Sequence, residues 1–134
     1  PTATLLMIDT DRFKDINDLY GHPAGDSVLR KIGKILGESV RGIDAAGRYG
    51  GDEFGILLTG TKLADAMIVA DRIRRRVAEA EFDIGLSAGC TISIGAAELG
   101  REMEVTRDWI LQADVALYRA KQTGRNQTAT LAAA

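Results

Sequence analysis

Hydrophobic and polar positions along the chain change repeatedly between the period of a strand and that of a helix. Residues 4–9 form a short apolar run that ends in a carboxylate, which is typical of a buried strand. From Asp26 onward, apolar side chains recur with the spacing of one helix face, while lysines take the other face. Residues 62–80 repeat this helical spacing. The pattern predicts one strand and two amphipathic helices in these segments.

A hairpin is predicted between the two helices. Residues 43–48 and 54–59 are both compatible with strands, and the chain between them contains Gly50 and Gly51. A pair of glycines tolerates the positive φ angles that a tight hairpin turn requires. We therefore expect the turn to be centred on Gly50 and Gly51.

The last third of the chain predicts a strand, a helix and a short final strand. Residues 90–97 alternate like a half-buried strand. Thr106 is expected to cap a helix that carries apolar residues between 109 and 120 and ends at Gly124. A final strand is expected at 127–131. The whole order predicts an α+β fold with a ferredoxin-like βαββαβ core, in which helices cover a mixed central sheet.

Length and composition narrow the class of protein. A chain of 134 residues corresponds to one domain. Its 17 basic and 19 acidic residues give a net charge of −2, without the excess of positive charge that accompanies binding to nucleic acid. The single cysteine, Cys90, excludes an internal disulfide, and no apolar run approaches the ~18 residues that cross a membrane. We expect a cytoplasmic protein that neither binds nucleic acid nor inserts into membranes.

Familiar metal and phosphate motifs are incomplete in this sequence. One histidine and one cysteine are too few ligands for a zinc site. Residues 55–62 have the two glycines of a phosphate loop, but Thr61 separates the second glycine from the lysine. Residues 9–20 have lysine and tyrosine where a calcium loop requires glycine and glutamate.

Three acidic residues are predicted to converge at one edge of the sheet. Asp9 ends the first strand, and Asp52 and Glu53 follow the glycine turn. Such oxygen ligands suit Mg²⁺, which is usually bound by one or two carboxylates together with substrate phosphates. Lys121 and Arg125, at the end of the last helix, suit either the helix dipole or a triphosphate. From the pattern alone, Asp52 and Glu53 could equally serve the solubility of the hairpin.

A family resemblance favours the functional interpretation. Residues 48–54 read Arg-Tyr-Gly-Gly-Asp-Glu-Phe, which resembles the signature of the GGDEF family of diguanylate cyclases. Further blocks at 9–18, 21–26, 91–95 and 113–126 resemble that family in the same order. The resemblance covers nearly the whole chain and implies a palm-like nucleotidyl cyclase fold.

The resemblance implies a reaction and its metal site. In this family two GTP molecules are condensed into cyclic di-GMP and pyrophosphate between two antiparallel domains, so catalysis requires a homodimer. Each half-site is expected to hold two Mg²⁺ ions, with Mn²⁺ as an alternative. The implied metal ligands are Asp9, the carbonyl of Thr10, Asp52 and Glu53. Asp52 and Glu53 are the implied catalytic residues, and Asp52 would help to deprotonate the attacking 3′-hydroxyl.

The resemblance also assigns the substrate contacts. Asn17 and Asp26 match positions that bind guanine, although Asp26 has an alternative interpretation as a helix N-cap. Gly50 and Gly51 would allow close approach of the nucleotide. The implied phosphate-binding residues are Lys14, Lys121 and Arg125.

A separate product site is implied just before the signature. Arg41 and Asp44 have the spacing of the family's RxxD site, through which cyclic di-GMP inhibits synthesis. An arginine can donate two hydrogen bonds to guanine O6 and N7. Arg74, on the second amphipathic helix, is expected to complete this site from a neighbouring domain.

One departure and two alternatives accompany the resemblance. Family members begin earlier, with an Asp-x-Leu-Thr turn and a helix, so residues 1–134 are interpreted as a GGDEF domain without that N-terminal helix segment. A sensory or dimerising domain is expected upstream in the full-length protein. The alternative function is a catalytically silent module that binds GTP or cyclic di-GMP. A cyclase acting on ATP is disfavoured by Asp26, because adenine lacks the donor pair that a carboxylate accepts.

Overall fold

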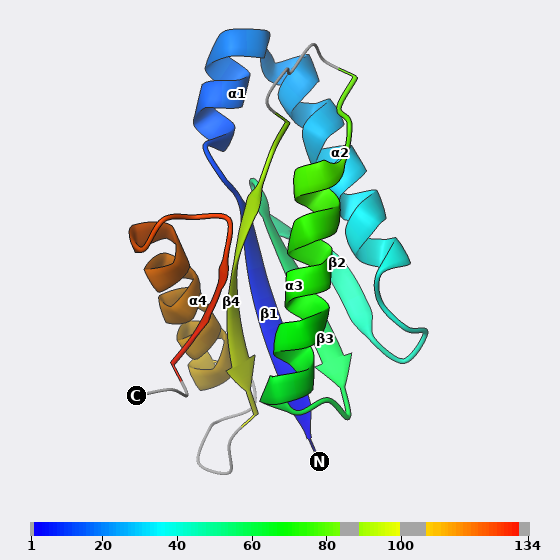
Figure 1. Cartoon of the computed structure of the whole chain (residues 1–134), viewed down its shortest axis with the longest axis vertical. Coiled ribbons are helices and arrows are strands. Elements are labelled where there is room, and N and C mark those ends of the chain that lie inside the picture. Colours follow the sequence, from blue (N-terminus) through cyan, green and yellow to red (C-terminus); the bar gives the residue numbers. More distant parts are fainter. Residues whose placement is uncertain (1, 84–88, 100–106, 132–134) are drawn as a thin grey trace.

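A computed structural model describes residues 2–83, 89–99 and 107–131 of the chain. Strands and helices follow one another in the predicted order, with one helix more than predicted near the N-terminus (Figure 1). The elements are β1 (Ala3–Thr10), α1 (Phe13–Tyr20), α2 (His22–Glu38), β2 (Ala45–Gly50), β3 (Glu53–Thr59), α3 (Leu63–Glu79), β4 (Ile92–Glu98), α4 (Arg107–Gln122) and β5 (Thr128–Thr130).

The strands form one mixed sheet with β1 at its centre. Their order is β2-β3-β1-β4-β5. β1 is antiparallel to both β3 and β4, β2 is antiparallel to β3, and β5 is parallel to β4. The first four strands in this order, with their connecting helices, form the predicted ferredoxin-like βαββαβ core.

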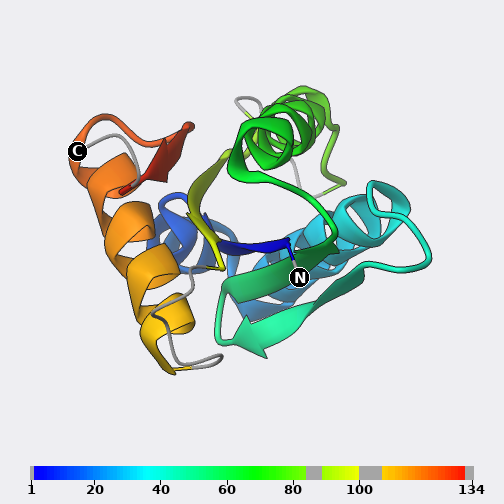
Figure 2. The same cartoon turned by 90° about the horizontal axis from the view of Figure 1, so that it is seen from below.

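Alternating residues of β1 supply two hydrophobic cores. Leu6 and Ile8 belong to the larger core, which α2 and α3 cover, whereas Met7 belongs to a smaller core under α4. Figure 2 shows α3 and α4 on opposite sides of β4. The contact between α4 and β4 is close, since a Cβ added to Gly95 would lie 2.2 Å from the Leu117 backbone nitrogen. All three side chains of β1 named here are at most 1 % exposed.

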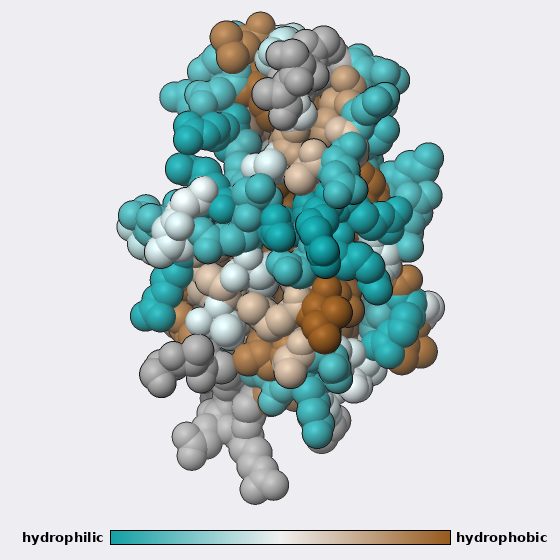
Figure 3. All heavy atoms as spheres, viewed as in Figure 1, coloured by the Kyte–Doolittle hydropathy of each residue, from teal (hydrophilic) through white to brown (hydrophobic). Residues whose placement is uncertain are grey.

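The exposed side of α3 carries mainly polar side chains. Hydrophilic side chains gather across the middle of the face on which α3 lies (Figure 3). On the inner side of the helix, Ala66, Ala70, Ile73 and Val77 are fully buried. No helix among the residues described in the structure is both long enough and apolar enough to cross a membrane.

The structure differs from the predicted elements mainly at the start of α2. Residues 13–20 form a separate helix, α1, which was not predicted because Ile16 is its only buried residue and so no apolar stripe is visible. α2 then begins at His22, earlier than the predicted Asp26, after a break at Gly21 with φ of 88°. The predicted cap at Thr106 lies outside the described residues.

Candidate active site

The pairing of β1 with β3 brings two of the predicted carboxylates together. Asp9 and Glu53 are directly opposite each other in the antiparallel register. The backbone N–H of Thr10 donates to the carbonyl of Asp52 at 3.4 Å, which joins the end of β1 to the hairpin turn. Residues opposite each other in such a pair have neighbouring side chains. The site is therefore built on the ends of two central strands.

Asp9 is buried, and only one of its carboxylate oxygens has a partner. The residue is 6 % exposed. Its Oδ2 atom accepts a hydrogen bond and ion pair from Lys121 Nζ of α4. Its Oδ1 atom is buried without a hydrogen-bond partner, as is the hydroxyl oxygen of Thr10. A buried carboxylate oxygen without a donor is costly, and a bound cation would satisfy it.

Asp9 and Glu53 are too few to hold a metal ion by side chains alone, but they suit Mg²⁺, whose remaining ligands come from elsewhere. Within the described part of the chain, no group of three or more His, Cys, Asp or Glu side chains is arranged to hold a metal ion. Mg²⁺ is commonly bound by one or two carboxylates, with water and substrate phosphates completing its coordination. Asp9 and Glu53 are hard oxygen ligands of the required kind.

The electrostatics of the site involve a carboxylate that sequence analysis did not select. Burial raises the pKa of Glu53, and the negative charges of Asp114 and Asp52 raise it further. The pKa of Asp114, on α4, is itself raised by burial. The pKa of Lys121 is lowered by burial and then by the positive charge of Arg125. Asp114 was missed because a single polar position on a helix does not reveal which strand it faces.

The hairpin turn is held by Arg48 and leaves space beside its glycines. Arg48 Nε donates to the carbonyl of Gly51 at 2.8 Å, and its Nη2 donates to the same oxygen. Gly51 has φ of +46°, and the strand register shifts between Arg48 and Gly50. A Cβ added to Gly50 or Gly51 would meet nothing within 4 Å. Only Gly51 is therefore required by backbone conformation, and the space beside both glycines is open to a ligand.

The predicted guanine-binding residues lie on α1 and α2. Asn17 Oδ1 is buried without a hydrogen-bond partner, and a Cβ added to Gly25 would lie 1.9 Å from it. Asp26 is exposed and lines a cavity of about 520 Å³ together with Arg48 and Phe54. Because α2 begins at His22, Asp26 lies inside the helix and is not its N-cap. That alternative interpretation of Asp26 is thereby removed.

The predicted phosphate-binding residues come from three places. Lys14 lies on the exposed side of α1, and Arg125 is exposed in the turn that follows α4. Lys121 is held at Asp9 by the ion pair described above. Of the three, the structure brings Lys121 into direct contact with a predicted metal ligand.

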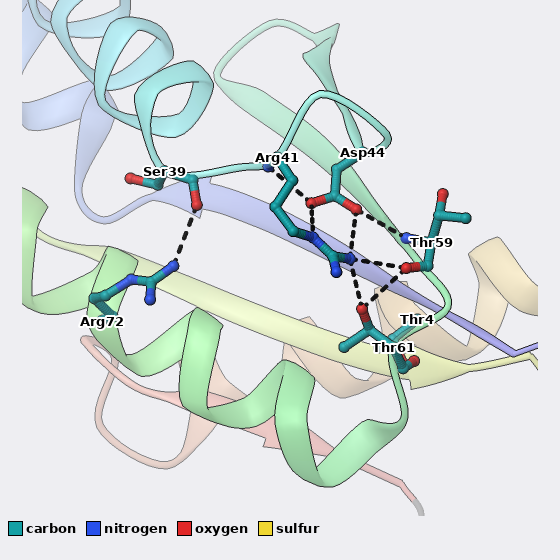
Figure 4. A network of polar contacts seen from close by, with 7 residues as sticks. All are labelled: Thr4, Ser39, Arg41, Asp44, Thr59, Thr61 and Arg72. Carbon is teal, nitrogen blue, oxygen red and sulfur yellow. Dashed lines mark hydrogen bonds and ion pairs between the residues drawn. The ribbon is translucent and has the colours of Figure 1, made fainter.

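Arg41 and Asp44 form a tightly bonded pair before β2 (Figure 4). Arg41 Nε and Nη2 donate to Asp44 Oδ2 and Oδ1 at 3.0 and 2.9 Å. Nη2 also donates to the carbonyl of Thr59 and to the hydroxyl of Thr61. The hydrogen bonds from Arg41 lower the pKa of Asp44, and the contact raises that of Arg41. The Asp44 side chain is 1 % exposed, whereas that of Arg41 is 57 % exposed and accessible to a ligand.

Arg72, and not Arg74, lies beside this pair within the chain. A cavity is lined by Arg41, Asp44 and Arg72, whose Nη2 donates to the carbonyl of Ser39 (Figure 4). Arg74 instead contacts Asp71 and Asn126. Two residues along a helix correspond to a rotation of about 200°, so the two arginines point to different neighbours. Sequence analysis missed Arg72 because it sits in a run of arginines with no local sign of which one faces Arg41.

Comparison with known proteins identifies the family to which this fold belongs. The family described as "Diguanylate cyclase, GGDEF domain" matches residues 2–127. The chain therefore belongs to the GGDEF family. Its mixed five-stranded sheet with four described helices has the palm-like fold of GGDEF domains.

Curated relatives of this chain are named as diguanylate cyclases or regulators. Diguanylate cyclase A of Treponema denticola is 46 % identical over 128 residues, which cover 94 % of this chain and 34 % of that protein. The response regulator PleD of Caulobacter vibrioides is 41 % identical over 127 residues, which cover 92 % of this chain and 28 % of that protein. The chain thus spans about a third of the length of these relatives.

Solved structures agree with this assignment. The GGDEF domain of DgcB from Caulobacter crescentus, in complex with c-di-GMP, superimposes with a TM-score of 0.89 at 30 % identity, covering 96 % of this chain and 77 % of that one. The active GGEEF domain of a diguanylate cyclase from Vibrio cholerae gives a TM-score of 0.89 at 34 % identity, covering 96 % and 81 %.

Proposed function

We propose that the chain is a diguanylate cyclase domain, which condenses two GTP molecules into one cyclic di-GMP and two pyrophosphates. Each 3′-hydroxyl attacks the α-phosphate of the other nucleotide, forming a P–O bond and releasing pyrophosphate. The observation that carries the proposal is the pairing of Asp9 with Glu53 beside the glycine turn, with one buried oxygen of Asp9 lacking a partner. The names of the relatives support the same reaction.

Asp9 and Glu53 would hold the divalent cations, with the main-chain carbonyl of Thr10 and the carboxylate of Asp52 as further ligands. When bound there, Mg²⁺, or Mn²⁺ in its place, would supply positive charge that neutralises the phosphates and makes the attacking 3′-hydroxyl more acidic. The ammonium of Lys121 occupies Asp9 Oδ2 in the structure. The unpartnered Oδ1 of Asp9 is the oxygen that would be left for a cation, and the ammonium of Lys121 beside it would be placed to contact the triphosphate.

We assign different roles to the two carboxylates beside the turn, proton acceptance to Asp52 and cation binding to Glu53. Asp52 is the group we assign to accept the proton of the 3′-hydroxyl as it attacks. Burial and neighbouring negative charge raise the pKa of Glu53, so a cation beside it is favoured over an empty site. Positioned charge would therefore supply most of the catalysis, as is general for phosphoryl transfer.

GTP would lie between the hairpin and α2. Asn17 and the Asp26 carboxylate are suited to accept from guanine N1–H and N2–H, which adenine does not offer as a pair. Asp26 lines the cavity of about 520 Å³ together with Gly47 and Arg48 of β2. Gly50 and Gly51 would leave room for the nucleotide beside the turn, since a Cβ added to either meets nothing within 4 Å. Lys14, Lys121 and Arg125 would hold the phosphates.

The reaction requires two copies of the domain. Each copy supplies one nucleotide with its cations, so we propose an antiparallel homodimer as the active form. A sensory or dimerising domain in the full-length protein, which would be located in the cytoplasm, would bring the two copies together.

Product inhibition is proposed to act through Arg41 and Asp44. The Arg41 guanidinium is 57 % exposed, and its Nη1 group, which takes no part in the bonds to Asp44, Thr59 and Thr61, would donate to the O6 or N7 acceptor of guanine while Asp44 holds the side chain in place. Arg72 lines the same cavity and would contact the product from the same chain. Arg74 remains the predicted contribution from a neighbouring domain.

Incubation with GTP and, separately, with ATP tests this function through the mass of the product. Cyclic di-GMP formed from GTP with Mg²⁺, and no cyclic product from ATP, is the expected result. The second candidate is a silent module that binds cyclic di-GMP, which the exposed guanidinium of Arg41 favours. Binding of cyclic di-GMP by calorimetry, without any product from GTP, would support that candidate instead.

A further inference from the structure

A buried carboxylate outside the proposed metal site joins three parts of the fold. Asp11, two residues after Asp9, is 6 % exposed. Its Oδ1 atom accepts from the Ser93 hydroxyl at 2.7 Å, and its Oδ2 atom accepts from the Thr91 hydroxyl at 2.7 Å and the Asn126 backbone N–H at 3.0 Å. One side chain thus links the end of β1, the start of β4 and the turn after α4.

The strained turns of the structure meet at Asp11. Within residues 2–83, 89–99 and 107–131, positive φ angles at non-glycine residues occur at Arg12 (54°), Arg125 (62°) and Asn126 (44°). L-residues rarely adopt this region, and such conformations persist only where their surroundings fix them. Arg12 follows Asp11 directly in the chain, and the backbone N–H of Asn126 donates to the Asp11 carboxylate. Asp11 is therefore placed to stabilise the turn at Arg12 and the turn at Arg125 and Asn126.

The turn after α4 is held from two sides at Asn126. Its backbone N–H donates to Asp11, and its side-chain oxygen accepts from Arg74 Nη1 of α3 at 3.1 Å. The N–H of Arg125 donates to the carbonyl of Ala120, which closes the turn on α4. Arg125 itself is exposed, so the direction of its side chain depends on the backbone of residues 125 and 126.

We propose that Asp11 is a positioning residue, which fixes the backbone at Asn126 so that Arg125 reaches the triphosphate of GTP. This inference rests on the proposed function. Arg74 is the second support of the same turn, which gives this arginine a role within its own chain. Asp11 does not touch the substrate, because its oxygens are occupied by Ser93, Thr91 and Asn126.

The experiment compares Asp11→Ala, Asp11→Asn and Arg125→Ala in two measurements. The first is hydrogen exchange of the Asn126 amide in the absence of nucleotide. The second is the affinity for 3′-deoxy-GTP, which lacks the attacking hydroxyl and therefore binds without turnover. Asparagine can still accept from the Asn126 N–H while its amide group donates to the Ser93 hydroxyl, so Asp11→Asn serves as the conservative variant.

Asp11→Ala is expected to speed exchange at Asn126 and to weaken nucleotide binding about tenfold, as for loss of a charge-assisted hydrogen bond. Arg125→Ala should weaken binding by a similar factor. The double variant should bind no more weakly than Arg125→Ala alone, because Asp11 acts through Arg125. Asp11→Asn should stay close to the wild type in both measurements.

Additive losses in the double variant, or wild-type affinity in a folded Asp11→Ala protein, would overturn the proposal. Should Asp11→Ala fail to fold, Arg74→Ala decides, since it removes the side-chain support of Asn126 together with a partly exposed ion pair to Asp71 on the same helix. It should weaken binding in a way that is again not additive with Arg125→Ala, while the matched control Arg75→Ala should not. Full affinity in Arg74→Ala would then contradict the proposal. If the wild-type chain itself does not bind 3′-deoxy-GTP, the proposed function fails together with the proposal for Asp11. If the wild type binds and only the variants depart from expectation, the proposal for Asp11 alone fails.

Discussion

Lys121 and Asp9 form an ion pair that joins the end of α4 to the end of β1 across 112 positions of sequence. The Asp9 side chain is 9 % exposed and that of Lys121 is 29 % exposed, so neither charge is fully hydrated. The second oxygen of Asp9 has no partner. Lys121 therefore stabilises a carboxylate that is arranged to receive a cation.

Lys121→Met is predicted to destabilise the chain by about 1–3 kcal/mol without divalent cation, because a buried carboxylate loses its partner. Mg²⁺ at millimolar concentration should restore part of this loss, since binding to the folded state stabilises it. Urea unfolding with and without Mg²⁺ measures both effects. Lys34→Met, on the solvent side of α2, is the matched control and should change the midpoint little. Equal midpoints for Lys121→Met and the wild type would contradict the role given to this pair.

Glu53→Gln is predicted to stabilise the chain at neutral pH in the absence of divalent cation. Burial and the charges of Asp114 and Asp52 raise the pKa of Glu53 in the folded state above its unfolded value. The folded state then binds the proton more tightly, so Glu53 lowers stability as the pH rises from the unfolded pKa through the folded pKa. The difference in unfolding free energy between variant and wild type should therefore shrink on acidification. If the difference in unfolding free energy instead grew towards acid pH, the pKa of Glu53 would be lowered by folding and the prediction would be wrong.

Gly25→Ala is predicted to displace Asn17 and to weaken binding of 3′-deoxy-GTP. The added Cβ would lie 1.9 Å from Asn17 Oδ1, so the amide must move. Lys31→Ala in the same helix is the control, because Lys31 is exposed and does not line the cavity that contains Asp26. The control should leave binding unchanged. Unchanged affinity in Gly25→Ala would remove Asn17 from the proposed guanine site.

Arg72→Ala and Arg74→Ala distinguish two versions of the product site. Arg72 lines the cavity beside Arg41 and Asp44, so its loss should weaken binding of cyclic di-GMP as strongly as Arg41→Ala does. Arg74 contacts Asn126 in its own chain, so its loss should leave binding to the monomer intact. Calorimetry at one concentration where the chain is monomeric and at another where it is dimeric makes the comparison. Weaker binding by Arg74→Ala at the dimeric concentration, with unchanged binding by Arg72→Ala at both, would favour the original prediction over Arg72.

The sequence predicts those parts of the fold that have a local pattern. The strand at residues 4–9 is a continuous apolar run because β1 is covered on both faces, and the two long helices have clear apolar stripes. The helix α1 has only Ile16 to mark it, so its period is not visible. The positions of the carboxylates follow once β1 pairs with β3, which the order of elements already favours.

Contacts between distant segments were not predictable from pattern. The partners of the Asp11 side chain lie 80 to 115 positions away along the chain. The residues next to Asp11 in the sequence do not indicate these partners, since hydroxyl groups and backbone N–H groups are common throughout the chain. Arg72 and Arg74 show the same limit within one helix, because their helical phase relative to Arg41 depends on how α3 packs. Sequence pattern therefore gives the elements, and packing decides which side chains meet.

The most direct test of the account follows pyrophosphate and cyclic di-GMP together after GTP and Mg²⁺ are added to the chain. We predict two pyrophosphates for each cyclic di-GMP from the wild type, and neither product from Asp9→Asn or Glu53→Gln, both folded by circular dichroism. Cyclic di-GMP formed at the wild-type rate by either variant would contradict the central claim that Asp9 and Glu53 together hold the catalytic cations.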